Sequence, residues 1–326
     1  MIKHFTSREL KTLRDLRERF LAGTAGGSDY WQSPEHLELY DTTYGERIGW
    51  KWDAVFAELR LRGWRPRSTR VLDWGCGTGV AHRRALTEWP QFSALALHDR
   101  SPRARFFSAE KVRAGFPQIP VTWNPPTVTP DTLLLVSHVI NELSPRDLED
   151  LLALARGAGE VIWVEAGTHA DSRRLIEVRE RLLGDFTPVA PCTHTAPCGM
   201  LVAENAPHWC HHFATPPSAI FQDARWAEFA RELGIDLRSV PFSFLVLARA
   251  PAMEPGWSRV IGLPREGKGY TRILSCQAEG VAEFMLQKRD APELFRAARK
   301  GQLAPVYRWT RAAGKIIDGE PLAVVP

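Results

Sequence analysis

The chain has 326 residues, of which 44% are hydrophobic and 25% charged, and its formal net charge is +4. This composition is typical of a globular protein and excludes a disordered or low-complexity chain. No apolar run approaches the roughly 20 residues that span a bilayer, and no signal peptide opens the chain, so we expect a cytoplasmic protein without membrane contact. The mild basicity is compatible with an RNA partner.

The first predicted elements are two helices. Residues Thr6–Leu21 are amphipathic, with Thr6 and Glu9 in the positions of a capping box, and the acids in this stretch argue against a transit peptide. We therefore expect a docked helix within an N-terminal helical segment, residues 1–39. The stretch Tyr40–Leu61 predicts a second helix that leads into the core.

A glycine-rich loop follows, and the rest of the chain is organised around it. A short apolar strand leads into Asp73, and three glycines then precede a helix-like stretch: Gly75, Gly77 and Gly79. Glycines suit such a turn because they allow positive φ angles and let a ligand approach the backbone. A second acid, Asp99, lies about 20 residues beyond the loop, where a Rossmann-type fold places its ribose-binding carboxylate.

This order of strand, loop, helix and second acid resembles the first motif of class I S-adenosylmethionine-dependent methyltransferases. Those proteins carry the acid-x-Gly-x-Gly-x-Gly pattern of Asp73–Gly79, with the acid at the strand end, rather than the pattern of a nicotinamide site. The resemblance implies that Asp73, the three glycines and Asp99 hold S-adenosylmethionine.

Strand-like and helix-like segments alternate after the loop. The predicted strands are Ala94–Leu97, Leu133–Val136, Val161–Val164 and Phe244–Ala248, and the predicted helices are Pro102–Ala114, Pro145–Leu154, Asp171–Leu183 and Ala224–Leu233. This alternation predicts an α/β fold, Rossmann-like and doubly wound, over residues 40–250. Ligands of such folds bind outside the carboxyl ends of the strands, where the glycine loop, Asp99 and residues 137–141 should converge.

The segment after the strand Leu133–Val136 faces the expected position of the transferable methyl group. Ser137 is a candidate cofactor ligand, and His138 and Asn141 are candidates for catalytic contact with the cofactor or the substrate. Each of the latter two could equally cap a helix or form a buried hydrogen bond.

A second motif, Asn124-Pro125-Pro126, is similar to the Asn-Pro-Pro-aromatic site of amino-directed DNA methyltransferases. It precedes the strand instead of following it, and Thr127 replaces the aromatic residue. We therefore interpret it as a turn.

Cysteines mark a stretch that the α/β fold does not need. Residues 188–215 form a predicted insertion that carries Cys192, Cys198 and Cys210 in a C-x5-C-x11-C pattern, and Cys276 lies far downstream. Without a secretion signal, this clustering indicates metal binding rather than disulfides. Structural zinc usually shows paired C-x2–4-C knuckles. The wide spacing suits an iron–sulfur cube at least as well, with zinc and buried free thiols as the alternatives.

The last part of the chain, residues 251–326, is predicted to be a β-rich and basic module. Its strand-like stretches are Ser258–Gly262, Tyr270–Cys276 and Val281–Leu286. Residues 288–315 contain eight Lys and Arg against two acids, a local balance of 8 − 2 = +6. Tyr307 and Trp309 lie in this run, and a basic stripe with aromatic residues suits an RNA backbone and stacked bases. A solvated surface is the plainer alternative.

Together these features resemble the methyltransferase-like proteins of mitochondrial small-ribosomal-subunit assembly and their bacterial relatives. The resemblance covers roughly residues 40–310 and rests on Pro191-Cys192-x-His194, Pro197-Cys198, Trp209-Cys210-His211, Cys276 and the Ser-His-x-x-Asn-Glu-Leu segment at 137–143. One departure is Thr193, where a proline is expected. The resemblance implies a [4Fe-4S] cluster held by the four cysteines, association with small-subunit rRNA, and a mitochondrial matrix location if the protein is eukaryotic.

Two kinds of function are consistent with the sequence. In the first, the protein is an S-adenosylmethionine-dependent methyltransferase of small-subunit rRNA, monomeric off the ribosome. In the second, it is a non-catalytic ribosome assembly factor that binds the cofactor and rRNA. A small-molecule methyltransferase with structural zinc is disfavoured by the basic C-terminal stripe. The motifs do not identify the chemical group that would accept the methyl, and they do not identify a target nucleotide.

Overall fold

The structure is a computed structural model that describes residues 4–21, 29, 31–123 and 126–323. The chain forms two compact units. The first comprises Met1–Ala54, Pro66–Val164 and Ala214–Val240, and the second comprises Val55–Arg65, Glu165–Phe213 and Pro241–Pro326. No helix within the described ranges is both long and apolar enough to cross a membrane.

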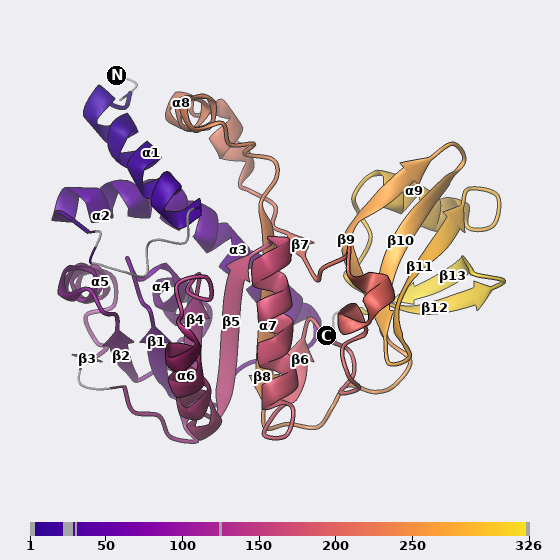
Figure 1. The fold of residues 1–326 in the computed structure, drawn as a ribbon, viewed down its shortest axis with the longest axis horizontal. Helices are drawn as coiled ribbons and strands as arrows, with labels where there is room; N and C mark the ends of the chain where they lie inside the picture. The colour runs from indigo at the N-terminus through magenta and orange to yellow at the C-terminus, as the bar shows by residue number, and fades with distance from the viewer. Residues whose placement is uncertain (1–3, 22–28, 30, 124–125, 324–326) are drawn as a thin grey trace. The chain divides into compact units, whose positions relative to one another are not determined.

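The first unit is built on a parallel sheet (Figure 1). Its strands are β1 (Arg70–Trp74), β2 (Ala94–His98), β3 (Val121–Thr122), β4 (Thr132–Ser137) and β5 (Glu160–Ala166), in the spatial order β3-β2-β1-β4-β5. The pairings between these strands are parallel. Residues Leu133–Val136 of β4 are fully buried, as expected of a parallel strand covered on both faces. The strand order reverses at β1, which is the switch point where Rossmann-type folds bind ligands.

Three helices connect these strands. α4 (Val80–Glu88) follows β1, α5 (Pro102–Gly115) follows β2, and α6 (Pro145–Gly157) follows β4. Ser101 and Ser144 cap the N-termini of α5 and α6, and each is followed by a proline, which suits the first helical turn. The predicted α/β fold with a parallel sheet is therefore confirmed for this unit.

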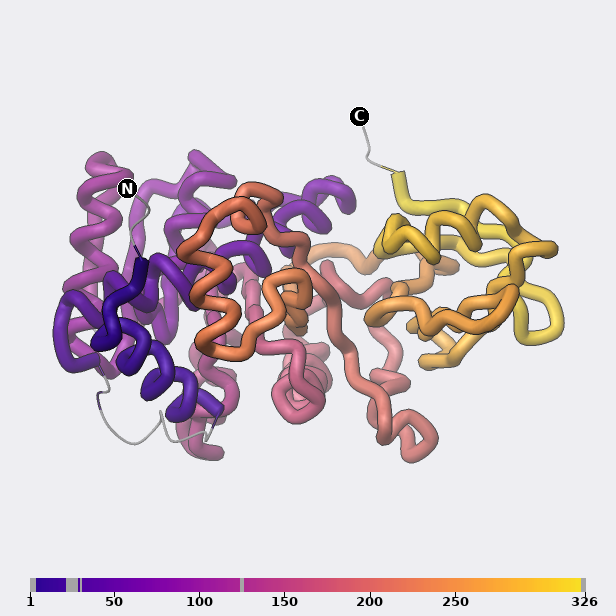
Figure 2. The backbone as a smooth tube through the Cα atoms, turned by 90° about the horizontal axis from the view of Figure 1, so that it is seen from above, coloured from indigo at the N-terminus to yellow at the C-terminus, as the bar shows by residue number. Residues whose placement is uncertain are grey.

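The N-terminal residues form a helix that is docked within the first unit. α1 (Ser7–Leu21) lies beside α8 (Ala224–Leu233), where Arg14 Nη2 donates to Glu232 Oε2 at 2.7 Å (Figure 2). The apolar face of α1 buries Leu13 and Leu16. The predicted docked helix is confirmed. A short 3-10 helix, Ser218–Gln222, precedes α8.

The predicted helix Tyr40–Leu61 is interrupted in the structure. The segment consists of α2 (Pro34–Tyr40), a π-helical turn (Asp41–Gly45) and α3 (Glu46–Leu61). The hydroxyl groups of Thr42 and Thr43 donate to the carbonyl of Leu39, so side chains compete with the backbone for the helix carbonyls at this point. The hydrophobic periodicity of the sequence does not reveal such a local competition, so the interruption of the helix was not predicted.

In the second unit, two short strands pair antiparallel with a third. β6 (Thr187–Ala190) and β7 (His212–Phe213) each pair with β8 (Pro241–Ala248), and α7 (His169–Leu182) precedes them. Two 3-10 helices, Gly199–Leu201 and Ala203–Asn205, lie between β6 and β7, in the stretch predicted as the cysteine-rich insertion.

Five strands of the second unit close into a barrel in the order β10-β11-β13-β12-β9. They are β9 (Ser258–Gly267), β10 (Tyr270–Gln277), β11 (Gly280–Gln287), β12 (Val306–Ala312) and β13 (Lys315–Pro321), with α9 (Pro292–Arg299) between β11 and β12. The three predicted strands of the C-terminal module are confirmed and are longer than predicted. β12 and α9 were not predicted, because the charges of residues 288–315 hide their hydrophobic pattern, and β13 was not predicted because Asp318, Gly319 and Glu320 interrupt its short apolar run.

The barrel interior corrects the prediction that the aromatic residues within 288–315 are available to stack on RNA bases. Tyr307 is only 4% exposed and stacks on Trp309 with ring centroids 4.1 Å apart. Both rings belong to the barrel core together with Ile273 and Leu286, because β12 points alternate side chains inward. Tyr307 is therefore not free to stack on an RNA base.

Candidate functional site

The predicted cofactor loop lies at the carboxyl end of β1, in the first unit. Gly75, Gly77 and Gly79 have φ angles of 74°, 52° and 84°, a region that favours glycine. The carbonyl of His98, at the end of β2, accepts a hydrogen bond from the amide of Gly75 at 2.7 Å. A Cβ on Gly75 would come within 2.5 Å of Val139 Cγ1, so the loop lies directly against the segment after β4. The structure thus brings these two predicted segments together.

Asp99 lies beside this loop. Its Oδ2 accepts from the amide of Gly77 at 2.9 Å, and its Oδ1 accepts from the amide of Ser101 at 2.8 Å. Burial raises the pKa of this carboxyl, and the two amide hydrogen bonds oppose the rise. Asp99 therefore ties the glycine loop to the N-terminus of α5. Its remaining lone pairs are the ones available to a ribose hydroxyl.

Asp73 is fully buried at the end of β1. Its Oδ2 lies 2.7 Å from Nδ1 of His82, which is fully buried in α4, whereas its Oδ1 has no hydrogen-bond partner among the described residues. An unpaired buried acceptor costs about 1–3 kcal/mol, so a ligand that donates to Oδ1 would recover that energy. His82 was not predicted, because its sequence neighbourhood resembles that of a solvent-facing helix residue.

The residues after β4 adopt an uncommon backbone conformation. His138 has a φ of 55°, which is strained for a residue with a Cβ. Its Nδ1 lies 3.2 Å from the carbonyl of Val164, and its Nε2 lies 2.8 Å from Nζ of Lys51 in α3. Burial and the Lys51 ammonium hold the pKa of His138 well below its usual value. The neutral ring therefore donates from Nδ1 and accepts from Lys51 at Nε2.

The other two candidates of this segment are placed differently. Ser137 Oγ accepts from Trp52 Nε1 at 3.1 Å, which fixes the hydroxyl at the end of β4. Asn141 is exposed in the turn that follows. The interpretation of Asn124-Pro125-Pro126 as a turn concerns two residues, 124 and 125, that lie outside the described residues.

Glu142 is a further titratable group of this segment. Its carboxylate lies 2.8 Å from Arg100 Nη2, and burial raises its pKa from 4.5 to about 7. A buried carboxyl with such a pKa beside the glycine loop is a functional-site candidate. Sequence reasoning passed over it, because burial is not visible in the residue pattern.

The raised pKa of Glu142 predicts a pH effect on stability. Because the folded protein binds this proton more tightly than the unfolded chain does, stability should fall as the pH rises from 4.5 to about 7. The variant Glu142→Gln lacks this titration. Denaturant unfolding at several pH values in that window should show a smaller decline for the variant than for the parent. Parallel declines would show that Glu142 does not titrate there.

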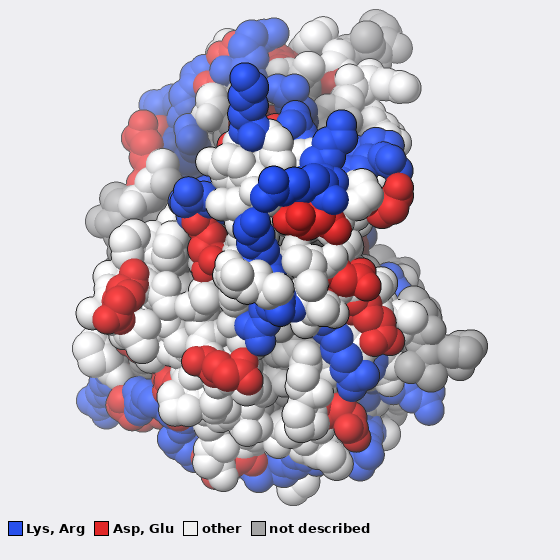
Figure 3. Space-filling model, turned by 90° about the vertical axis from the view of Figure 1, so that its right-hand side faces the viewer, with Lys and Arg blue, Asp and Glu red and all other residues white. Residues whose placement is uncertain are grey.

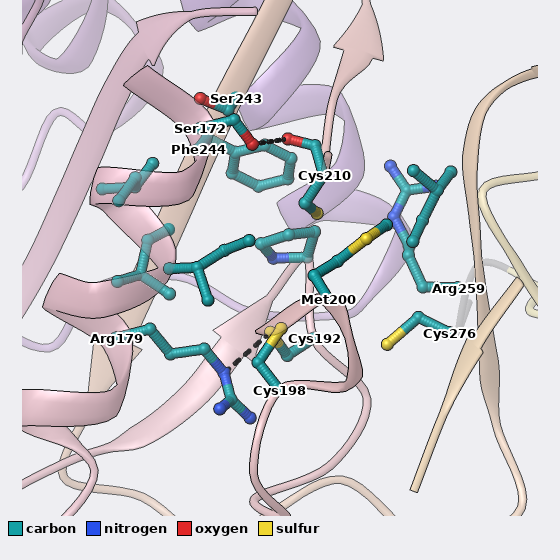
Figure 4. Close-up of a pocket in the computed structure, with 15 residues that line it drawn as sticks. Ser172, Arg179, Cys192, Cys198, Met200, Cys210, Ser243, Phe244, Arg259 and Cys276 are labelled. Atoms are coloured by element: carbon teal, nitrogen blue, oxygen red, sulfur yellow. Dashed lines mark hydrogen bonds between the residues drawn. The ribbon is translucent and has the colours of Figure 1, made fainter. Parts of the chain in front are cut away.

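Four cysteines of the second unit line one pocket (Figure 4). Cys192 follows β6, Cys198 precedes the first 3-10 helix, Cys210 precedes β7 and Cys276 belongs to β10. Apolar side chains complete the wall of the pocket: Leu175, Ile176, Met200 and Ile261. The structure therefore brings together the four cysteines that the sequence singled out.

The electrostatics of this pocket disfavour free thiolates. Burial raises the pKa of Cys198 to about 11 and also raises the pKa values of Cys210 and Cys276, and repulsion from Cys192 adds to each shift. Arg179 Nε donates to Cys192 Sγ at 3.2 Å (Figure 4). Four gathered thiolates need more positive charge than one such contact supplies, and a bound metal centre would provide it.

The pocket does not present a ready site for a single ion. Within the described ranges, no group of three or more His, Cys, Asp and Glu side chains is arranged to hold one metal ion. His194 Nε2 lies 3.4 Å from Cys276 Sγ, as a hydrogen-bond partner. The predicted metal site is therefore not confirmed. The donor set itself, four thiols in a largely apolar pocket, fits iron–sulfur ligation.

Comparisons with known proteins give one family and several distant structures. Residues 53–308 match the sequence model of the family described as mitochondrial small ribosomal subunit Rsm22. No curated protein matches the sequence significantly. The plantazolicin methyltransferase BamL, solved in complex with a triazolic desmethylPZN analog and SAH, is 11% identical at a TM-score of 0.38, over 74% of this chain and 100% of that chain. The mitomycin 7-O-methyltransferase MmcR is 13% identical at a TM-score of 0.36, and the match covers 73% of this chain and 67% of that chain.

Proposed function

This chain belongs to the Rsm22 family of mitochondrial small ribosomal subunit proteins, and we propose that it binds S-adenosylmethionine and acts on small-subunit rRNA. The observation that carries the proposal is the glycine-loop site. Three positive-φ glycines, two acids and the strained His138 meet at the switch point of a parallel sheet. The family description is what points to the ribosomal target.

Each residue of this site has a defined role in the proposal. The cofactor, when bound, supplies a methyl group activated on a sulfonium. Asp73, through its unpaired Oδ1, and Asp99 accept hydrogen bonds from it, and the glycines let it approach the backbone. Ser137 and His138 hold the segment after β4 in place. That segment positions the RNA nucleophile, since catalysis of this kind is mostly positioning.

A second function is favoured by one contact. Lys51 occupies Nε2 of His138, the ring nitrogen that would otherwise take a proton from the methyl acceptor. A non-catalytic assembly factor would bind the cofactor and rRNA without turnover. Incubation with labelled cofactor and purified small-subunit rRNA separates the two functions. Labelled rRNA establishes a methyltransferase, whereas binding without transfer supports the assembly factor.

We also propose that the cysteine pocket holds a [4Fe-4S] cluster through Cys192, Cys198, Cys210 and Cys276. A zinc ion would need all four sulfurs about 2.3 Å from one centre. In a cluster each thiolate binds its own iron, so the ligands stand farther apart. Four thiols that line one pocket support a shared metal centre, and their wide C-x5-C-x11-C spacing favours the cluster over the paired knuckles of structural zinc.

The cofactor role of Asp99 is tested by Asp99→Ala. The loss of a hydrogen bond to a charged acceptor should weaken S-adenosylmethionine binding by at least about tenfold in titration calorimetry. Asp150→Ala, at an exposed position of α6, is the matched control and should bind as the parent does. Thermal unfolding checks that loss of the contact with Gly77 leaves the variant folded. Equal affinity of a folded Asp99→Ala would remove this residue from the site.

A further inference from the structure

The barrel of the second unit has the arrangement of an oligonucleotide-binding fold. It is closed, has five strands, carries α9 between its third and fourth strands, and pairs β11 parallel with β13. In the OB-fold, the outer face of the second and third strands, with the loops between strands one and two and between strands four and five, binds oligonucleotides. The equivalent parts here are β10, β11 and the loops around Lys268 and Gly314. Topology alone does not establish binding, so the surface itself must be considered.

The outer face of β9, β10 and β11 is divided into two halves. Strand register places Arg259 opposite Cys276, Ile261 opposite Leu274 and Arg265 opposite Arg272 on this face. Ile261, Leu274 and Cys276 pack with Ile176 and Met200 in one hydrophobic cluster at the cysteine pocket. This half is therefore covered. The half around Arg265 and Arg272 is not.

The open half carries a compact set of charged and apolar side chains. Arg265 and Arg272 are 61% and 49% exposed, and both form ion pairs with Glu283 of β11. Arg272 also lies over the ring of Tyr270, 5.8 Å from its centroid. Leu263 is 59% exposed on the neighbouring strand β9. Two arginines share one carboxylate, so the set has a net charge of 2 − 1 = +1, and exposed Lys268 adds to it.

We propose that this open half of the barrel face, centred on Arg265 and Arg272, binds a single-stranded segment of RNA. Guanidinium groups pair with phosphates and stack on bases, and Tyr270 and Leu263 offer an apolar surface beside them. The exposed surface of the strands can contact the splayed bases of single-stranded RNA. In duplex RNA the bases are paired and lie inside the helix, where this surface could not reach them. The proposal rests on the rRNA association proposed above and assigns it a surface and a form of RNA.

The basic run on α9 is a weaker candidate for the same role. Arg296 is paired with Glu293 of its own helix, and Arg299 lies 3.0 Å from Glu266. Each of these two arginines thus has a carboxylate of its own, which cancels its charge. In the open half, by contrast, Arg265 and Arg272 share the single carboxylate of Glu283. The view onto the barrel shows a band of Lys and Arg side chains with acidic side chains beside it (Figure 3).

The test is the anisotropy of a labelled single-stranded oligouridine of about 12 nucleotides, a length within the site sizes of OB-folds. The double variant Arg265→Ala/Arg272→Ala should bind more weakly, with a salt slope shallower by about 0.7 per lost phosphate contact. The double variant Arg231→Ala/Arg238→Ala removes two exposed, ion-paired arginines of the first unit and is the matched control. It should bind as the parent does.

A second variant acts in the opposite direction. Glu283→Gln removes the carboxylate that Arg265 and Arg272 share, so it should tighten RNA binding, whereas damage to the barrel would loosen it. Unchanged binding by the arginine variant, or unchanged or weaker binding by a Glu283→Gln variant whose thermal unfolding matches that of the parent, overturns the proposal and leaves the rRNA association standing. A preference for duplex RNA also overturns it. No binding of the oligonucleotide by the parent overturns this proposal, whereas the rRNA association is overturned only if purified small-subunit rRNA is not bound either.

Discussion

Replacement of Glu58 by glutamine should lower the free energy of unfolding by about 3–5 kcal/mol, the usual cost of removing one partner from a buried ion pair. Glu58 Oε1 accepts from Arg62 Nη2 at 2.7 Å, and its Oε2 accepts from Arg259 Nη2 at 2.8 Å. All three side chains are buried in the second unit. Glutamine keeps the shape but leaves two guanidinium groups without a counter-charge.

The effect should extend to the cysteine pocket. Arg62 also donates to the backbone carbonyls of Val189, Pro191 and Cys192, so it holds the first cysteine in place. Urea unfolding gives the stability difference. Glu293→Gln is the matched control, because its partner Arg296 is exposed and such pairs contribute about 0–1 kcal/mol. A loss for Glu58→Gln no larger than that of the control would contradict the assigned role.

The second large effect concerns the cysteines. Protein prepared without oxygen should contain iron and sulfide and absorb broadly in the visible range, and Cys210→Ser should lose both properties. The same result is expected for each of the other three pocket cysteines, because all four line one site. Cys76→Ser is the control, since Cys76 is buried in the glycine loop of the other unit and should not affect the cluster.

Two other results would redirect the proposal. A colourless parent with one zinc ion per chain would replace the cluster by zinc. A parent without metal, after anaerobic preparation and reconstitution with iron and sulfide, would leave the four thiols as buried residues of the packing. Because metal sites of this kind stabilise the folded state, a loaded parent should also unfold at a higher temperature than its metal-free form.

Local patterns predicted a substantial part of the fold. The glycine loop was found because its glycines, the acid before them and the flanking strand and helix lie within one short stretch. The parallel strands were found because they are apolar runs bounded by turns. The four cysteines could be grouped because thiols are rare in such a chain, although three of them lie in one stretch and Cys276 does not.

What sequence reasoning missed depends on contacts between distant residues. Lys51 meets His138, and His82 meets Asp73, only after the sheet has formed. The exposure of Tyr307 was misjudged because β12 was not recognised, and only the strand decides which side chains point inward. The surface around Arg265 could not be predicted either, because the barrel register that pairs it with Arg272 is not visible in the sequence.

The position of Cys276 on β10 has a consequence for the order of events in the cell. Synthesis proceeds from the N-terminus, so Cys192, Cys198 and Cys210 leave the ribosome well before Cys276 does. A nascent chain that has not completed its barrel offers only three thiols to a metal-delivery system. If the pocket holds its cluster as proposed, insertion of the cluster is delayed until the last module has folded. Only a fully synthesised and folded chain would then contain the cluster. Truncated or misfolded copies would lack it and would remain accessible to proteases.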